Sequence, residues 1–240
     1  MLTLNEKTML GDIPDDWEFK PLQQLLSNHY PGDWGDDRGP NMVKVIRSTN
    51  LTKHGYLNLE DVALRALPQV VEVNLIPKKD DLLLERSGGG PDQSVGRIGF
   101  IEYDMPGYAF SNFLYLLRPD PNKINPRFLG WILYYINQTG RVTRLEQQTT
   151  QMRNLNFRDY MIMPIPIPST SEQSLIARVL DSINLLIINT EKALVCTKKL
   201  NLALKQQLLP PWVGFRELPI NQITNNIAEI ARADTVADIE

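Results

Sequence analysis

A basic segment in the second half of the chain is the first place where side chains could do chemistry. Between residues 118 and 158 there are seven basic side chains and only two acidic ones, in a chain whose formal net charge is −3. The basic residues are Arg118, Lys123, Arg127, Arg141, Arg144, Arg153 and Arg158. Clustered Lys and Arg side chains bind the phosphates of nucleic acids, even in a protein that is acidic overall. The segment therefore indicates either a nucleic-acid-binding face or an ordinary solvated surface.

Other groups of residues that could support catalysis do not have the spacing that the chemistry requires. The glycine-rich stretch 87–97 lacks the Gly-Lys-Ser/Thr ending of a P-loop and the GxGxxG spacing of a dinucleotide site. Asp80, Asp81 and Glu85 could be imagined as metal ligands, but charges at a strand edge explain them better. One cysteine and two scattered histidines exclude a disulfide framework and a His-rich metal site. We expect no catalytic site, no metal and no cofactor.

The segment from Glu172 to Leu209 is predicted to be one long helix. It contains no proline or glycine, whereas prolines precede it at 164, 166 and 168 and follow it at 210 and 211. We expect its N-cap among residues 169–171. Steps of three and four residues from Ile176 follow a mostly apolar stripe, which is typical of a coiled-coil seam. The seam residues expected to mediate pairing are Ile176, Leu180, Ile183, Ile187, Leu194, Leu204 and Leu208. Such a helix needs a second long helix beside it, unless it lies across its own domain.

The residues before this helix predict a mixed-sheet α+β domain. Apolar patterning predicts strands within 42–47, 80–86, 98–102, 108–118 and 161–168, and a helix over 126–137. Residues 61–67 are predicted to form a short helix, and the polar segment 144–155 is expected to be a loop. The expected organisation is a domain over 1–168, a long coiled-coil helix over 169–210 and a short tail over 211–240.

The overall composition is that of an ordinary globular protein. The 240 residues are 42% hydrophobic and 22% charged. No apolar run approaches the ~20 residues that a membrane span needs, and the N-terminus lacks the basic-then-apolar layout of a signal peptide. We therefore expect a soluble, cytoplasmic protein with no membrane partner.

Several motifs follow one another in an order that is informative as a set. They are KTMLGDIPDDWE (7–18), VIRSTNLTKHGYL (45–57), DLLLERSGGG (81–90), VGRIGFI (95–101), LRPD (117–120), PRFLGWIL (126–133), LNFRDYMIMPIPIPS (155–169) and EQSLIARVL (172–180). In this order they resemble one half of a specificity (S) subunit of type I restriction-modification systems. Each motif alone is degenerate, but the run from IPIP to EQ and into a long helix is fairly specific to that family.

The resemblance implies a non-catalytic target recognition domain over 1–168, joined to a conserved helix. Full-length S subunits carry two such units, whose helices pair antiparallel as a spacer between the two domains. This chain carries one unit, so the resemblance implies a homodimer that reads a bipartite, palindromic site in double-stranded DNA. The implied partners are a methyltransferase (M) subunit and, through it, a restriction (R) subunit.

Residues of the types that read DNA occur in two loops and around a glycine turn. Arg suits guanine and Asn or Gln suits adenine, whereas Lys, Arg, Ser and Thr hold the DNA backbone. The expected contacts are Arg47, Ser48, Thr49, Asn50 and Lys53 in the first loop, Arg86, Ser87 and Arg97 around the turn 88–90, and Gln147, Gln148, Thr149, Thr150, Gln151, Arg153 and Asn154 in the basic segment. Each of these stretches could instead be an ordinary solvated connection.

Two other functions remain open at the level of sequence. The acidic composition favours a coiled-coil protein-interaction module without DNA specificity. A nonfunctional remnant of a longer subunit is a further hypothesis, which the intact seam and the acidic tail make less favourable. Salt-sensitive DNA affinity separates the DNA-reading function from the interaction module.

Overall fold

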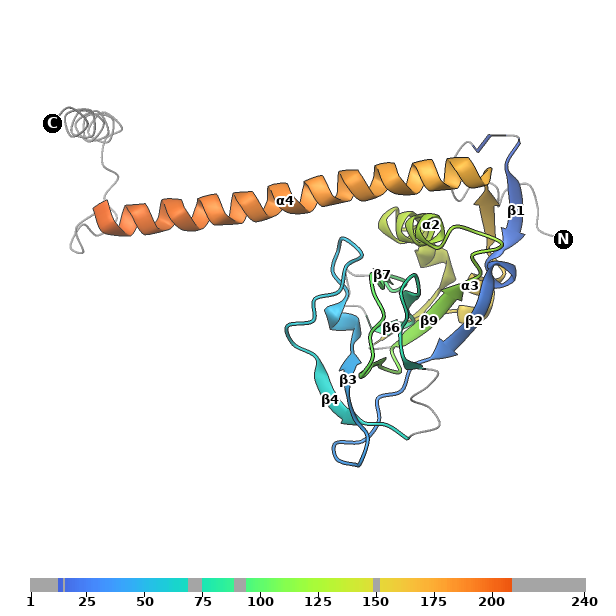
Figure 1. The fold of residues 1–240 in the computed structure, drawn as a ribbon, viewed down its shortest axis with the longest axis horizontal. Coiled ribbons are helices and arrows are strands. Elements are labelled where there is room, and N and C mark those ends of the chain that lie inside the picture. The colour runs from blue at the N-terminus through green and yellow to red at the C-terminus, as the bar shows by residue number, and fades with distance from the viewer. Residues whose placement is uncertain (1–12, 15, 69–74, 89–93, 149–151, 209–240) are drawn as a thin grey trace. The chain divides into compact units, whose positions relative to one another are not determined.

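The computed structural model describes residues 13–14, 16–68, 75–88, 94–148 and 152–208 (Figure 1). Over these ranges the chain is α+β, as predicted, with short strands in small sheets followed by one long helix. None of the helices in these ranges is both long and apolar enough to cross a bilayer. The expected tail over 211–240 lies outside the described residues.

A four-stranded antiparallel sheet separates two hydrophobic cores. Its strands, in order, are β2 (Leu26–Pro31), β9 (Leu114–Pro119), β5 (Leu82–Glu85) and β7 (Ile98–Phe100). Strand β5 is buried along its whole length, and its successive side chains point to opposite faces of the sheet. Leu82 and Leu84 therefore enter the first core, whereas Leu83 enters the second.

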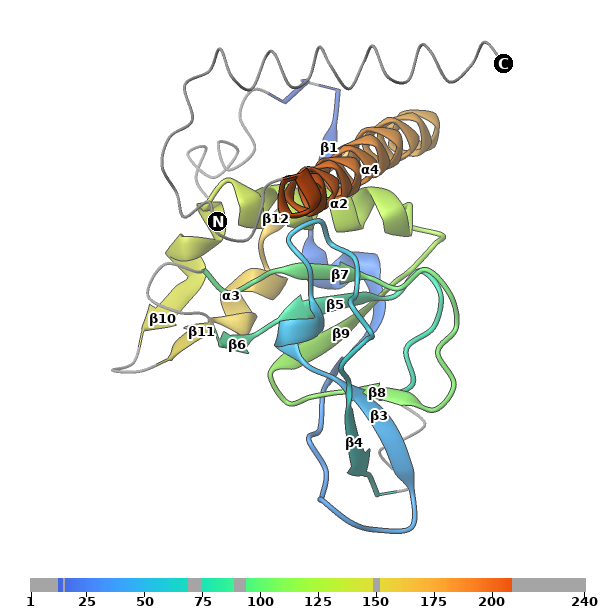
Figure 2. The same ribbon diagram turned by 90° about the vertical axis from the view of Figure 1, so that its left-hand side faces the viewer.

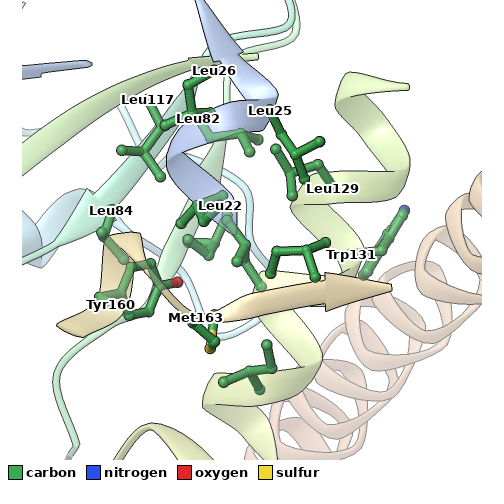
Figure 3. Packing of buried hydrophobic residues seen from close by; sticks show 14 of the residues in the cluster. Leu22, Leu25, Leu26, Leu82, Leu84, Leu117, Leu129, Trp131, Tyr160 and Met163 are labelled. Carbon is green, nitrogen blue, oxygen red and sulfur yellow. The ribbon is translucent and has the colours of Figure 1, made fainter. Parts of the chain in front are cut away.

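The first core is formed between the sheet and the helical elements. These elements are η2 (Leu22–Leu25), α2 (Pro126–Gln138), α3 (Phe157–Met161) and the start of the long helix. Figure 3 shows Leu22, Tyr160 and Met163 in the same cluster as Leu84 of the sheet. Helix α2 confirms the prediction for 126–137. Its N-cap is Asn125, whose side chain accepts hydrogen bonds from two backbone N–H groups of the first turn.

The second core includes side chains of a three-stranded sheet. Its strands, in order, are β4 (Ala63–Ala66), β3 (Met42–Ile46) and β8 (Tyr108–Phe110), and β3 runs antiparallel to β4 and parallel to β8. The helix predicted over 61–67 is therefore wrong. A segment this short does not form a stable helix on propensity alone, and pairing with β3 satisfies its backbone instead.

A proline-rich strand leads into the long helix. Strand β12 (Pro164–Ile167) pairs antiparallel with β1 (Glu18–Pro21) in a two-stranded sheet, a setting that tolerates residues without an N–H donor. The side chains and backbone N–H groups of Ser169 and Glu172 then form a reciprocal capping box. Helix α4 covers Thr170–Leu208, so the predicted long helix is confirmed and its boundaries differ by one or two residues.

The first part of α4 packs against the domain. The compact unit of the chain extends to Leu186, and a second unit begins at Ile187. Ala177 is buried in the first core, and Ile176 and Leu180 are partly buried against it. These two seam residues therefore contact the chain's own domain. Four further predicted seam residues are about half exposed, namely Ile183, Ile187, Leu194 and Leu204, and the side chain of Leu208 lies outside the described residues.

A buried glutamine joins the first turn of α4 to the start of α2. Gln173 is 3% exposed. Its side-chain oxygen accepts from the backbone N–H of Asn125 at 2.8 Å, and its amide group donates to the carbonyl of Pro168 at 2.9 Å. Both ends of the amide thus satisfy backbone groups that would otherwise lie unpaired at the junction of the two helices.

Replacing Gln173 with alanine (Q173A) is expected to lower the free energy of unfolding by about 1–3 kcal/mol, because two backbone groups lose their partners. Urea unfolding of the purified chain measures the change. The matched control is Q206A, since Gln206 is an exposed glutamine of the same helix and its loss is expected to change stability by less than about 0.5 kcal/mol. Equal losses in the two variants would contradict the role given to Gln173.

Candidate nucleic-acid interface

Two segments that are far apart in the sequence form one small sheet (Figure 2). Its strands, in order, are β10 (Glu146–Gln148), β11 (Arg153–Leu155) and β6 (Ser87–Gly88), all antiparallel. The hydroxyl of Ser87 donates to the side-chain oxygen of Asn154 at 2.6 Å. The prediction of a loop over 144–155 is therefore wrong for the described residues. After the 3-10 turn η4 (Arg141–Leu145), residues 146–148 and 153–155 are strands that pair with each other, whereas 149–151 lie outside the described residues. The sequence did not show this because β11 also pairs with β6, a distant partner: Ser87 and Asn154 are 67 residues apart in the chain.

The turn η3 (Ser48–Asn50) lies close to this sheet at Gly88. A Cβ at position 88 would lie 3.7 Å from the hydroxyl oxygen of Ser48, an ordinary contact distance, and 3.3 Å from a carboxylate oxygen of Glu85. Glycine suits the position because its φ is +130°, a conformation that side chains with a Cβ rarely adopt. The first predicted DNA-contact loop therefore lies beside Gly88, as the sequence alone could not show.

A buried ion pair fastens η3 to the central sheet. The side chain of Glu85 is 1% exposed, and Arg97 donates to its two oxygens at 2.7 and 2.9 Å. The same guanidinium donates to the carbonyl oxygens of Ser48 and Leu51, each at 2.9 Å. Arginine suits this position because its planar fork binds a carboxylate with two parallel hydrogen bonds and has further donors for the carbonyls. Arg97, predicted to contact DNA, is thus engaged in holding the turn.

Asn50 is another predicted contact residue whose side chain is used inside the protein. It is 4% exposed, and its oxygen accepts from the backbone N–H of Arg47 at 2.8 Å. Its amide group donates to the carbonyls of Asn58 at 2.8 Å and Asp61 at 2.7 Å. Arg47 in turn forms an ion pair with Asp61 at 2.8 Å. Both side chains therefore shape the loop that follows η3.

Nine of the predicted contact residues are at least partly accessible. Arg47 and Arg97 are two of them, but their side chains bond within the protein. The other seven are Ser48, Thr49, Lys53, Arg86, Gln147, Arg153 and Asn154. Ser87 is buried beneath the hairpin, where it orients Asn154. Residues Thr149, Thr150 and Gln151, and the side chain of Gln148, lie outside the described residues. The accessible side chains come from all three predicted stretches, which the structure brings together around β6 and β11.

The basic residues of 118–158 do not form one continuous charged face, because neighbouring carboxylates pair with four of them. These pairs are Arg118–Asp81, Lys123–Asp120, Arg127–Asp181 and Arg153–Glu146. The hydrogen bonds that Arg118 donates to Asp81 raise the pKa of Arg118 above its usual value. Among the residues that the structure describes, no carboxylate pairs with Arg141, Arg144 or Arg158. The sequence cluster therefore overstates the free positive charge.

The turn over residues 52–56, which follows η3, is held by both neighbouring helices. Asn184 of α4 donates to the carbonyl of His54 at 3.0 Å, and the hydroxyl of Tyr134 on α2 donates to the carbonyl of Lys53 at 2.9 Å. Asn184 is 6% exposed. The backbone of Lys53, a predicted DNA-contact residue, is therefore held by α2, and that of the neighbouring His54 is held by the first part of α4. Sequence reasoning missed this link, since a lone Asn within an apolar helix does not indicate its partner.

An aspartate on α4 receives two hydrogen bonds from α2. Asp181 accepts from the guanidinium of Arg127 at 2.6 Å and from the indole N–H of Trp131 at 2.7 Å. Arg127 also donates to Glu102 at 2.6 Å. A cleft of about 430 Å³ lies beside these residues, with Leu185 on its rim. Across the described residues, no cluster of three or more His, Cys, Asp or Glu side chains could hold a metal ion.

Comparison with known proteins identifies a family with this architecture. Residues 14–195 match the family described as type I restriction modification DNA specificity domain. The chain is 24% identical over 230 residues to the putative type I restriction enzyme MjaX specificity subunit of Methanocaldococcus jannaschii. The match covers 91% of this chain and 52% of that protein, so the chain spans about half the length of this curated relative.

Solved structures share the fold at low sequence identity. The HsdS subunit from Thermoanaerobacter tengcongensis has a TM-score of 0.50 and 17% identity, over 79% of this chain and 45% of that one. The type I restriction-modification S subunit from M. genitalium has a TM-score of 0.51 and 16% identity, over 78% of this chain and 45% of that one. A chain from a study of complex assembly and conformational transition of the type I R-M system has a TM-score of 0.59 and 18% identity, over 82% of this chain and 46% of that one.

Replacing Arg97 with methionine (R97M) is expected to lower the free energy of unfolding by about 3–5 kcal/mol, because the charge of Glu85 stays buried without a partner. Urea unfolding measures the loss. The double variant E85M/R97M is expected to recover part of it, since two apolar side chains leave no uncompensated charge but the carbonyls of Ser48 and Leu51 still lose the Arg97 donor. A double variant as unstable as R97M would contradict this account of the ion pair.

Proposed function

The chain belongs to the type I restriction modification DNA specificity family, and we propose that it recognises double-stranded DNA for such a system without itself catalysing a reaction. The observation that carries the proposal is the convergence of three stretches of DNA-reading residue types around the β6–β11 pair. In this proposal the chain supplies sequence specificity. The methyltransferase subunit and, through it, the restriction subunit act on the DNA that the chain has bound.

The hairpin β10–β11 is the proposed base-reading element. A two-stranded ribbon fits a major groove that is about 12 Å wide. Gln147 and Asn154 are directly opposite one another in the hairpin, so their side chains share one face. Amide side chains are suited to adenine, which presents an acceptor and a donor side by side. The hydrogen bond from Ser87 holds the Asn154 amide in one orientation, which favours selective rather than adaptable recognition.

The loop that contains η3 is the proposed backbone-binding element on one side of the hairpin. Ser48 and Thr49 offer hydroxyl groups, and Lys53 offers a charge. Contacts of these types hold the register of a protein on DNA without reading its sequence. Because the Glu85–Arg97 pair and the contacts to α2 and α4 fix this loop, it can hold the hairpin in one register.

A second copy of the chain is the proposed partner of α4. Along the helix, Ile183, Ile187, Leu194 and Leu204 are each 45–53% exposed and follow the three-and-four spacing of a coiled-coil seam. Burying such a stripe against another helix removes apolar surface from water. Two copies related by a two-fold axis present two reading surfaces, and so read a bipartite, palindromic site. In this division residues 1–168 recognise DNA and residues 169–210 set the spacing.

A protein-interaction module without DNA specificity is the second candidate. The pairing of four basic side chains with carboxylates of the same chain favours it, because those charges are not free to bind phosphates. The two functions differ in salt dependence, since phosphate contacts make DNA affinity fall steeply as the salt concentration rises.

Adenine methylation across the genome tests the DNA-reading function. We expect cells that express this chain with a type I methyltransferase subunit to methylate adenines within one bipartite, palindromic sequence. Cells that express the methyltransferase subunit alone are expected to lack that pattern. Long-read methylome sequencing compares the two, and identical methylation in an active system would refute the proposed function.

Replacing Leu194 with glutamate (L194E) is expected to convert a dimer into a monomer, because two charges would enter the centre of the apolar seam. Light scattering measures the mass of the particle, which for the unaltered chain is expected to be twice 27.4 kDa. The matched control is L185E, because Leu185 and Leu194 are each 53% exposed, and the nine residues between their positions put Leu185 about 180° away around the helix. A monomer in the unaltered chain, alone and with its methyltransferase partner, would disprove pairing through α4.

A further inference from the structure

A row of one arginine and three aromatic rings lies next to β6. The guanidinium of Arg86 is 5.0 Å from the centre of the Tyr115 ring. Tyr115 and Phe157 stack with their centres 3.7 Å apart and 12° between their planes, and His29 lies 5.4 Å from Phe157. We refer to Arg86, Tyr115, Phe157 and His29 as the stacked row. Its three rings belong to residues that the sequence patterns did not single out.

The alternation of side chains along the strand places the stacked row opposite η3. Leu84 is paired with Tyr115, and both contact the first core. Glu85 points to the other face of the sheet, where Arg97 connects it to η3. Arg86 then returns to the face of Tyr115. One short strand therefore has the η3 loop on one side and the stacked row on the other.

Arg86 differs from most other arginines of the domain in having free donors. Among the described residues, no side chain or carbonyl accepts a hydrogen bond from its guanidinium, and no carboxylate pairs with it. Stacking on Tyr115 limits the positions that the guanidinium can take while leaving its N–H edge open. A planar fork with five unused donors, held at the surface, is suited to an oxyanion such as a phosphodiester.

We propose that the stacked row is a second phosphate-binding flank of the DNA interface, with Arg86 as the contact residue and with Tyr115 and Phe157 as positioning residues. The inference rests on the proposed function and deepens it. A ribbon lying in the major groove has one sugar–phosphate backbone on each side. The η3 loop faces one backbone, and Arg86 faces the other. Phe157 lies two residues after the end of β11, so the chain connects the stacked row directly to the hairpin.

The number of phosphates that the protein contacts is measurable without knowing the recognised sequence. We would titrate the full chain with its methyltransferase subunit onto a mixed-sequence DNA duplex at several salt concentrations, following fluorescence anisotropy. Losing one phosphate contact lowers the slope of log affinity against log salt by about 0.9, and weakens binding about eightfold near 0.1 M salt. We expect both changes in the variant R86Q. R86K, which keeps the charge, is expected to retain the slope.

Two further variants separate contact from positioning. Y115L removes the ring but keeps an apolar side chain. We expect this single substitution to weaken binding of the DNA duplex. When it is combined with R86Q, we expect no further loss of affinity beyond that of R86Q alone. Y115F keeps the ring and is expected to bind like the unaltered chain. The matched control is R178Q, since Arg178 is an exposed arginine on α4 away from the row.

The outcomes distinguish this inference from the function on which it rests. If the unaltered complex shows no salt-dependent affinity for the duplex, the proposed function fails, and the stacked row's role fails with it. If the unaltered complex binds and R86Q keeps its slope, only the stacked row is refuted. Weaker capture of the methyltransferase subunit by R86Q, with DNA binding unchanged, would also refute it, because Arg86 would then contact protein.

Discussion

The buried contact between Glu85 and Arg97 is the interaction on which the proposed reading surface depends. It places a full charge inside the domain, where only a partner with several donors can compensate for the loss of water. Because the same guanidinium also binds two carbonyls around η3, the central sheet and the first contact loop are held as one unit. Gly88 of β6 lies beside Ser48 of η3, and its φ of +130° favours glycine at this position.

Polar contacts also explain how a reading surface can be held by a helix. Gln173, Asp181 and Asn184 all lie on the first part of α4, and each bonds to a different part of the domain. Apolar packing alone is non-directional, whereas hydrogen bonds with defined partners select one rotation of the helix. The turn that carries Lys53 is therefore positioned by α4 as well as by the sheet, which suits a protein whose proposed task is to set two surfaces at a fixed distance.

The arginines divide by what occupies their donors. Arg97, Arg118 and Arg127 are bound to carboxylates and serve the fold. Within the described part of the chain, the guanidinium of Arg86 is held only by the face of the Tyr115 ring, which restrains it without using its hydrogen bonds. This division reconciles a net negative chain with DNA binding, since affinity for phosphate depends on which charges are free rather than on the total.

The sequence by itself determined the elements whose signals are local. The absence of proline and glycine between Ser169 and Leu209, the Ser169–Glu172 cap and the proline at the first position of α2 are properties of neighbouring residues, so both helices could be predicted to within one or two residues. Only the tertiary structure decided that 63–66 is a strand, that 146–148 pairs with 153–155 and that Asn50 and Arg97 bond inside the protein. Each of these depends on a partner distant in the chain, and side-chain type does not reveal which distant group will satisfy it. The fold class and the motif order were therefore accessible from sequence, whereas the free or engaged state of each contact residue was not.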